Sequence, residues 1–412
     1  MAKPSLRVLW HWSSMGPYHF ARMNALARAP GIELTVVEIA ASDGHGWIRS
    51  EKAKGFTLIT LRPDALSRRL LKDTRHDLLR VLNETHPDIV VAAGYRDLYS
   101  LRAMLAYRAS NPTTLMLLWS ESTAADHSRS RAIEAAKALI LKAFDGALVA
   151  GKQHAAYLAS LGMPAPDMQA VGNCVDNDLF ERRASPPQAD AGAKETPDNY
   201  FLFVGRFVPQ KNLSRMIEAY REYRQRAGSA AWDLVLVGSG PEEGSLKRQI
   251  RESGIEGTWF PGLRQAQDLP GYYARARCFV LPSISEPWGL VVNEAMASEL
   301  PVLVSNRCGC VPDLLEDGVN GFVFDPFDTH ALATLLFRVS TGAVPLRDIA
   351  ANARHKVSGY SPALFSERAA THLRSVYESR LRKPVSSRVR RSAALLVRVA
   401  IDFAGGFSNL PS

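Results

Sequence analysis

Short apolar runs alternate with amphipathic windows along most of the chain, and the two patterns differ in period. Between the runs, apolar residues recur at the helical spacing of about 3.6 residues, as at Phe20, Met23 and Leu26. Strands that alternate with helices predict parallel sheets with helices on both faces. The strand-like runs of the first half are Leu6–Trp12, Leu34–Ile39, Phe56–Leu61, Asp88–Ala93, Thr114–Trp119 and Gly146–Ala150.

The alternation stops at residues 184–199, which hold three prolines and no large apolar side chain, and then begins again. Such a stretch cannot build a core, so we expect a linker there. Further strands are expected at Tyr200–Val204, Leu234–Val237, Thr258–Phe260, Cys278–Leu281, Val302–Val304 and Gly321–Phe324. The expected parts are an N-terminal domain at 1–183, the linker, a second domain at 200–360, a helix at 361–383 that returns to the first domain, and a tail at 384–412.

A chain of 412 residues is long enough for two domains. The fold class that we predict is α/β, with two Rossmann-like domains facing a central cleft. Ligands of such sheets bind beyond the carboxyl ends of the strands. The residues that directly follow each strand are therefore the candidates for chemistry.

Two cations follow the first strand of the second domain. Arg206 comes directly after the run FLFVG, and Lys211 lies five residues later at the expected start of a helix. Fixed positive charge beside the free N–H groups of a helix end suits a diphosphate. Two solvated surface charges beside a glycine turn are the alternative. The next strand ends in Gly238-Ser239-Gly240, which fits either a close ligand approach or an ordinary turn.

Two carboxylates lie in the segment SEPWGLVVNEA, which follows the strand ending at Leu281. Glu286 is expected in a loop, Pro287 is expected to begin a helix, and Glu294 is expected about two turns into it. Both side chains are suited to accept hydrogen bonds from sugar hydroxyls. Alternatively, Glu286 is an acid favoured by the helix dipole and Glu294 is an exposed helix residue.

The order of these motifs over Tyr200–Pro326, with two glutamates separated by seven residues, resembles the retaining glycosyltransferases of family 4, which have the GT-B fold. The resemblance implies that Arg206 and Lys211 bind the donor diphosphate without a metal, that Glu286 contacts the transferred sugar, and that Glu294 binds the ribose. It also implies roles for backbone N–H groups of Trp288, Gly289 and Leu290 at donor oxygens, and for Leu263 and Arg264 at the base.

In the first domain, Gly16 matches a glycine that lets the donor phosphates approach in this family. Where many relatives have a histidine near the anomeric centre, this chain has Ser120-Glu121-Ser122. Either Glu121 replaces that contact or the acceptor chemistry is organised differently. Tyr95, Arg96 and His127 are candidates for acceptor contacts, although a loop histidine is more often solvated.

The net charge of +9 is concentrated near the C-terminus, where residues 380–401 hold seven Lys or Arg and no Asp or Glu. The rest of the chain is close to neutral, which disfavours nucleic-acid binding. Arg388, Arg391 and Arg398 lie on one side of an amphipathic helical pattern, which indicates either an anionic membrane surface or a helix packed on the first domain. Four cysteines form no disulfide scaffold, and the Cys308-x-Cys310 pair has no partner cluster for a metal.

We therefore expect a retaining, metal-independent transfer from a UDP- or GDP-sugar to a hydroxyl acceptor, a glycan or glycolipid, without any cofactor. Polysaccharide or glycolipid synthesis is the expected setting. The expected location is cytoplasmic, with peripheral attachment to the inner leaflet if the tail binds membrane. The alternatives are a GT-B epimerase or phosphorylase, or a non-catalytic protein that binds nucleotide sugars or acts as a membrane scaffold.

Overall fold

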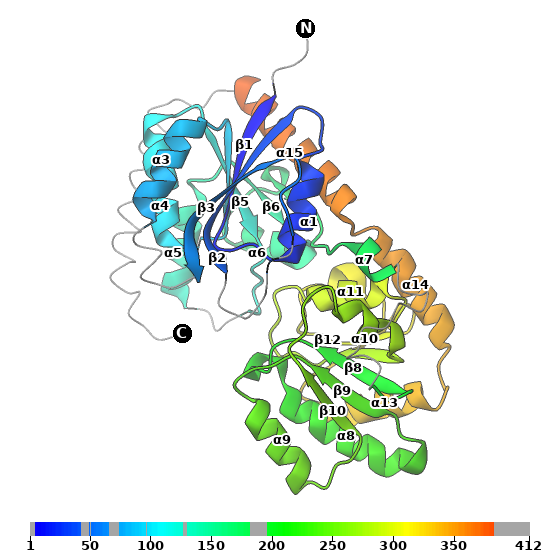
Figure 1. Cartoon of the computed structure of the whole chain (residues 1–412). Helices are drawn as coiled ribbons and strands as arrows, with labels where there is room; N and C mark the ends of the chain where they lie inside the picture. The colour runs from blue at the N-terminus through cyan, green and yellow to red at the C-terminus, as the bar shows by residue number, and fades with distance from the viewer. Residues whose placement is uncertain are drawn as a thin grey trace. The chain divides into compact units, whose positions relative to one another are not determined.

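The computed structural model describes residues 5–42, 49, 51–65, 74–95, 97–126, 130–181 and 196–382, and they form two compact units (Figure 1). Unit 1 comprises Met1–Ala124, Ser128–Asn173 and Pro362–Ser412. Unit 2 comprises Ala125–His127 and Cys174–Ser361. Each unit is built around its own parallel sheet.

The sheet of unit 1 has seven strands among the described residues, in the order β3-β2-β1-β4-β5-β6-β7. All neighbouring pairs are parallel. The strand order reverses between β1 and β4, and this boundary is the topological switch point of a doubly wound sheet. The strands are β1 (Leu6–Trp12), β2 (Ile32–Ser42), β3 (Thr57–Ala65), β4 (Ile89–Ala93), β5 (Leu115–Ser120), β6 (Gly146–Val149) and β7 (Met168–Ala170).

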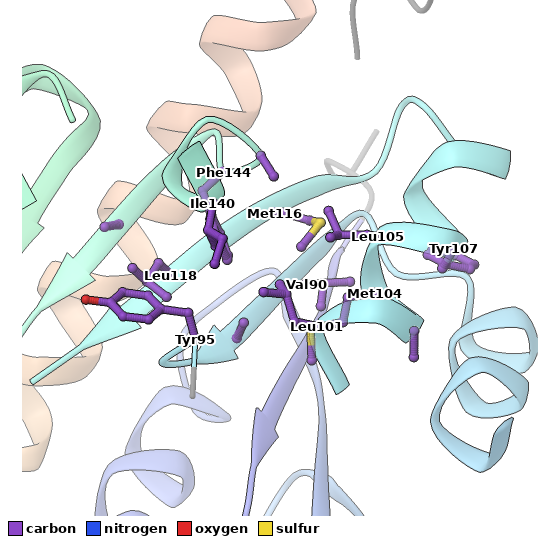
Figure 2. Packing of buried hydrophobic residues seen from close by; sticks show 14 of the residues in the cluster. Val90, Tyr95, Leu101, Met104, Leu105, Tyr107, Met116, Leu118, Ile140 and Phe144 are labelled. Carbon is purple, nitrogen blue, oxygen red and sulfur yellow. The ribbon is translucent and has the colours of Figure 1, made fainter. Parts of the chain in front are cut away.

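Helices cover both faces of this sheet. On one face, Trp10 and Trp119 pack against Phe365, and Ser366 Oγ donates to Ala25 O, so that α15 lies against α1. The other face carries an apolar cluster that includes Val90, Met116 and Leu118 and is shown in Figure 2. The helices are α1 (Pro17–Leu26), α3 (Arg75–Thr85), α4 (Leu98–Ser110), α5 (Arg131–Leu141), α6 (Lys152–Ser160), the short 3-10 helix η1 (Ala165–Asp167) and α15 (Pro362–Arg382).

In the described part of unit 2, the sheet has six strands in the order β10-β9-β8-β11-β12-β13, also parallel throughout. The central strand β8 reads YFLFV and is buried at every position, as expected for a strand covered on both faces. The switch point lies between β8 and β11. The strands are β8 (Tyr200–Val204), β9 (Asp233–Val237), β10 (Thr258–Gly262), β11 (Cys278–Leu281), β12 (Val302–Ser305) and β13 (Phe322–Phe324).

Around this second sheet, α8 packs against α13, and α11 packs against α14 and α7. The helices of unit 2 are α7 (Asn177–Glu181), η3 (Pro209–Lys211), α8 (Leu213–Ala227), η4 (Gly228–Ala230), α9 (Glu243–Glu252), α10 (Leu269–Arg275), α11 (Leu290–Ala297), α12 (Val311–Leu314), α13 (Thr329–Ser340) and α14 (Leu346–Ser358). The predicted α/β class with two Rossmann-like sheets is confirmed. Every strand expected from the sequence overlaps an observed strand, and the three-residue β7 was missed.

Candidate functional site

The loops that follow β8 and β11 meet at the switch point of unit 2. The Ile284 amide donates to Gln210 O at 2.9 Å, which joins the two loops through their backbones. Asn212 has a left-handed backbone with φ of 58° and is buried. Its Nδ2 donates to Pro282 O and Pro326 O, so the end of η3 is tied to the carboxyl ends of β11 and β13. These bonds of Asn212 also fix the backbone position of Lys211, which directly precedes it in the sequence.

Lys211 and Glu286 face each other across this switch point. Lys211 Nζ donates to Glu286 Oε2, and Ser283 Oγ donates to the same oxygen at 3.3 Å. Both side chains are mostly buried, with 17% and 16% of their surface exposed. The structure thus brings together one of the two predicted diphosphate cations and the predicted sugar-binding carboxylate.

The glycine turn after β9 is explained by backbone packing. A Cβ at Gly238 would lie 1.8 Å from Gly205 O, and one at Gly240 would lie 2.3 Å from Phe207 O. The Phe207 amide donates to Ser239 O at 2.9 Å. Glycine is therefore needed here for the close approach of two loops of the protein itself.

The loop after Glu286 differs from the expected one, because Pro287 does not begin a helix. α11 begins at Leu290, and Gly289 is its N-cap with φ of 97°, a conformation that favours glycine. Glu286 therefore lies in the loop before the helix and not at the helix terminus. Its backbone carbonyl accepts a hydrogen bond from the Gly309 amide at 2.9 Å. The first turn of α11 therefore starts after Gly289 rather than at Pro287.

Glu294 lies in α11 and is 6% exposed, so the alternative of an exposed helix residue is wrong. Tyr273 OH, from α10, donates to Glu294 Oε2 at 2.7 Å. Burial raises the pKa of the Glu294 carboxyl to about 7, although the tyrosine bond acts in the opposite direction. The spacing of residues in the sequence does not predict this raised pKa, because it arises from burial in the folded unit.

The remaining donor candidates vary in exposure. Arg206 is exposed, whereas the Trp288 ring is buried and its Nε1 donates to Asn293 Oδ1 at 2.8 Å. Leu263 is 37% exposed after β10, and Arg264 Nε donates to Tyr272 OH at 2.8 Å.

Cys308 and Cys310 are buried free thiols beside this site. Burial and the negative charge of Glu286 both raise the pKa of each thiol. Among the described residues, no group of three or more His, Cys, Asp or Glu side chains is arranged to hold a metal ion.

In unit 1, Gly16 precedes α1, and its amide donates to His19 Nδ1 at 2.9 Å. Burial and the charge of Arg22 lower the pKa of His19 well below its usual range, which agrees with a neutral ring that accepts a backbone bond. Gly16 has an ordinary φ of −100°. A Cβ there would meet nothing closer than 3.7 Å within the unit, so packing does not require a glycine.

Glu121 follows β5 and is held by two residues that the sequence did not single out. Asn173 Nδ2 donates to Glu121 Oε1 at 2.8 Å, and Arg22 Nη1 lies 3.7 Å from the same oxygen. Tyr95 follows β4, but it is 8% exposed and its ring packs in the core (Figure 2). Arg96, His127 and the tail arginines 388, 391 and 398 lie outside the described residues.

Comparison with known families gives this geometry a context. Residues 186–356 match the family model of glycosyl transferases group 1. Over 163 residues the chain is 32% identical to the amylovoran biosynthesis glycosyltransferase AmsK of Erwinia amylovora. This matched region covers 38% of this chain and 39% of the relative. Over 188 residues it is 31% identical to a GDP-mannose-dependent phosphatidylinositol monomannoside mannosyltransferase of Mycolicibacterium smegmatis, covering 43% and 48% respectively. The matched regions thus span less than half of each curated relative.

Similarity to solved structures extends over most of the chain. Anabaena Alr3699/HepE in complex with UDP-glucose superimposes with a TM-score of 0.68 at 17% identity, covering 90% of this chain and 100% of the other. This likeness, together with the two parallel sheets, shows the GT-B fold. No helix of the described residues is both long and apolar enough to span a membrane.

Proposed function

We propose that the protein transfers a sugar from a UDP- or GDP-sugar to a hydroxyl group of a glycan or glycolipid, with retention of the anomeric configuration. The observation that carries the proposal is the Lys211–Glu286 pair at the switch point of unit 2. A nucleotide-sugar donor has a diphosphate next to a hydroxylated sugar. A lysine ammonium beside a carboxylate suits such a donor, because the ammonium can bind the diphosphate and the carboxylate can accept hydrogen bonds from the sugar. The group 1 match over residues 186–356 covers both side chains.

In the proposed mechanism, Lys211 and Arg206 stabilise the negative charge that develops on the departing nucleoside diphosphate. Glu286 then accepts hydrogen bonds from the sugar, and Glu294 accepts them from the ribose. The departing phosphate assists the attack of the acceptor hydroxyl on the same face of the sugar, which preserves the configuration. No metal ion is required in this scheme, because the two cations supply the positive charge.

The test is a turnover assay with UDP-glucose, UDP-galactose, UDP-N-acetylglucosamine and GDP-mannose as donors and octyl hexosides as acceptors. We expect release of UDP or GDP that depends on the acceptor, and a product with the anomeric configuration of the donor by NMR. Lys211→Ala should abolish most of this turnover. Lys247→Ala is the matched control, since Lys247 forms a similar pair with Glu243 on the surface of α9.

Nucleotide binding without turnover of any donor would favour the non-catalytic alternative. Inversion of the configuration would contradict the proposed retaining mechanism while leaving the transferase intact.

A further inference from the structure

Arg22 is a fully buried cation near the carboxyl ends of β1 and β5. It extends from α1, it is 1% exposed, and its Nε donates to Tyr18 O at 3.1 Å. The guanidinium carbon lies 5.7 Å from the Trp12 ring, 5.3 Å from the Trp119 ring and 5.7 Å from the Phe365 ring. Its Nη2 has no hydrogen-bond partner among the described residues. Packing against three rings thus replaces part of the hydration that this charge loses.

The guanidinium is directed at a carboxylate that is only partly covered. Arg22 Nη1 donates to Asn173 Oδ1 at 2.6 Å, and Asn173 Nδ2 donates in turn to Glu121 Oε1 at 2.8 Å. The amide orientation is fixed by these two bonds together. The Glu121 side chain is 37% exposed, and within the described residues its Oε2 makes no hydrogen bond or ion pair. One oxygen is therefore held by the protein while the other remains available.

A stability role alone does not explain an arginine at this position. A buried charge is weak evidence for stability, because replacement of a whole buried ion pair by apolar side chains of similar volume is often neutral or stabilising. Methionine is flexible, and its sulfur packs favourably against aromatic rings, so it suits the space between Trp12, Trp119 and Phe365. The charge and the hydrogen bond to Asn173 are what such a replacement would remove.

We propose that Arg22, together with Asn173, is a positioning residue that orients Glu121 so that Oε2 accepts a hydrogen bond from a hydroxyl group of the acceptor sugar. This inference rests on the proposed function, which supplies the acceptor. It makes unit 1 a source of acceptor recognition through a carboxylate at the end of β5. A carboxylate fixed at one oxygen orients the incoming hydroxyl without loss of side-chain freedom on binding.

The test is a double-mutant cycle with Arg22→Met, Glu121→Gln and the combination of both, assayed by transfer to octyl hexosides. We expect each single variant to lower kcat/KM for the acceptor at least tenfold, and the double variant to be no more than about twofold slower than the slower single variant. Affinity for UDP and GDP should stay within twofold of wild type. Wild-type kcat/KM in Arg22→Met, or a double loss equal to the product of the single losses, would overturn the proposal.

Arg108→Met is the matched control, because Arg108 is a second buried arginine of unit 1 and pairs with Asp145 at 3.0 Å. Asp145 directly precedes β6, so this pair lies at the opposite, amino-terminal edge of the sheet. Arg108→Met should lower the melting temperature and leave kcat/KM of the folded protein within twofold. A tenfold loss there as well would show that any buried arginine of unit 1 gives the same effect, and it would refute the specific role of Arg22.

A second readout does not depend on turnover. The shift in melting temperature caused by Arg22→Met should differ between the wild-type and the Glu121→Gln backgrounds, because the two side chains interact. Equal shifts in the two backgrounds would refute the interaction even if no donor is ever turned over. If the melting-temperature shifts differ between the two backgrounds but the wild-type protein turns over no donor, the result would count against the proposed function alone.

Discussion

Lys211 donates to Glu286 across the switch point of unit 2, so the cation proposed for the diphosphate is already paired with a carboxylate. A bound diphosphate and Glu286 would compete for the same ammonium group. Binding of the donor as proposed would therefore loosen the pair and free the carboxylate for the sugar. The two roles that we propose for these residues are linked by this exchange.

The first prediction follows for Glu286→Gln. Because the variant removes the competing charge, UDP or GDP should bind at least as tightly as to wild type. Transfer should fall by about two orders of magnitude, since the sugar loses its charged partner. Calorimetric titration and initial rates on one preparation would show both effects. Weaker nucleotide binding in Glu286→Gln would contradict the competition.

The second prediction concerns Lys211→Ala, which should weaken UDP or GDP binding by roughly 10- to 150-fold. This range corresponds to the loss of a charge-assisted contact of about 1.5–3 kcal/mol. Lys247→Ala should bind the nucleotide like wild type. Unchanged affinity in both Lys211→Ala and Arg206→Ala would rule out the proposed diphosphate site.

The third prediction is a pH dependence that arises at Glu294. Its carboxyl has a pKa of about 7, so the carboxylate that would accept ribose hydroxyls becomes the major form only above neutral pH. Nucleotide affinity should therefore rise between pH 6 and pH 8. Tyr273→Phe removes a bond that lowers this pKa, so the rise should move to higher pH.

Glu294→Gln is the control for this profile and should show weak, pH-independent binding. The free energy of unfolding should fall over the pH range in which nucleotide affinity rises. The folded protein holds a proton on Glu294 that the unfolded chain releases at lower pH, so this group favours folding in acid, and its contribution is lost as the pH rises through about 7. A flat wild-type binding profile would contradict the assigned role of Glu294.

The fourth prediction concerns the cysteines. All four thiols are free and buried, and burial raises the pKa values of Cys278, Cys308 and Cys310. The native protein at pH 8 should react with less than one equivalent of a thiol reagent such as DTNB over minutes, and the denatured protein should react with four. Rapid reaction of Cys308 or Cys310 in the native protein would mean that the loop beside Glu286 opens readily.

The fifth prediction concerns the tail, which lies outside the described residues. If residues 384–412 bind an anionic membrane, their deletion should reduce co-sedimentation with anionic vesicles, and added salt should do the same to the intact protein. Turnover of octyl hexosides should survive. If the tail instead packs on the protein, wild type should not bind vesicles, and the deletion should lower the melting temperature.

The sequence predicts the sheets well because buried parallel strands are short, continuous apolar runs such as YFLFV in β8. It fails for β7, which has three residues and no fully buried position. It also fails for the helix after Glu286, because the proline signal at 287 competes with the glycine at 289, whose left-handed backbone forms the actual N-cap.

Residues of the site that depend on distant partners were harder to predict. The pKa of Glu294 depends on burial and on the bond from Tyr273 of another helix. The orientation of Glu121 depends on Arg22 and Asn173 from two other segments. Their separations along the chain follow no helical or strand period. Only the packing of the folded units brings these groups together.

The bonds of Asn212 restrict which amino acids this position tolerates. Glycine would accept the left-handed backbone but would offer no amide to Pro282 O and Pro326 O. Aspartate would also accept the backbone, but it would place a negative charge against the same two carbonyl oxygens. Lysine and arginine are disfavoured by the backbone angle and by burial. Natural variants that keep Lys211 should therefore keep asparagine directly after it, and a library randomised at position 212 should return asparagine almost exclusively.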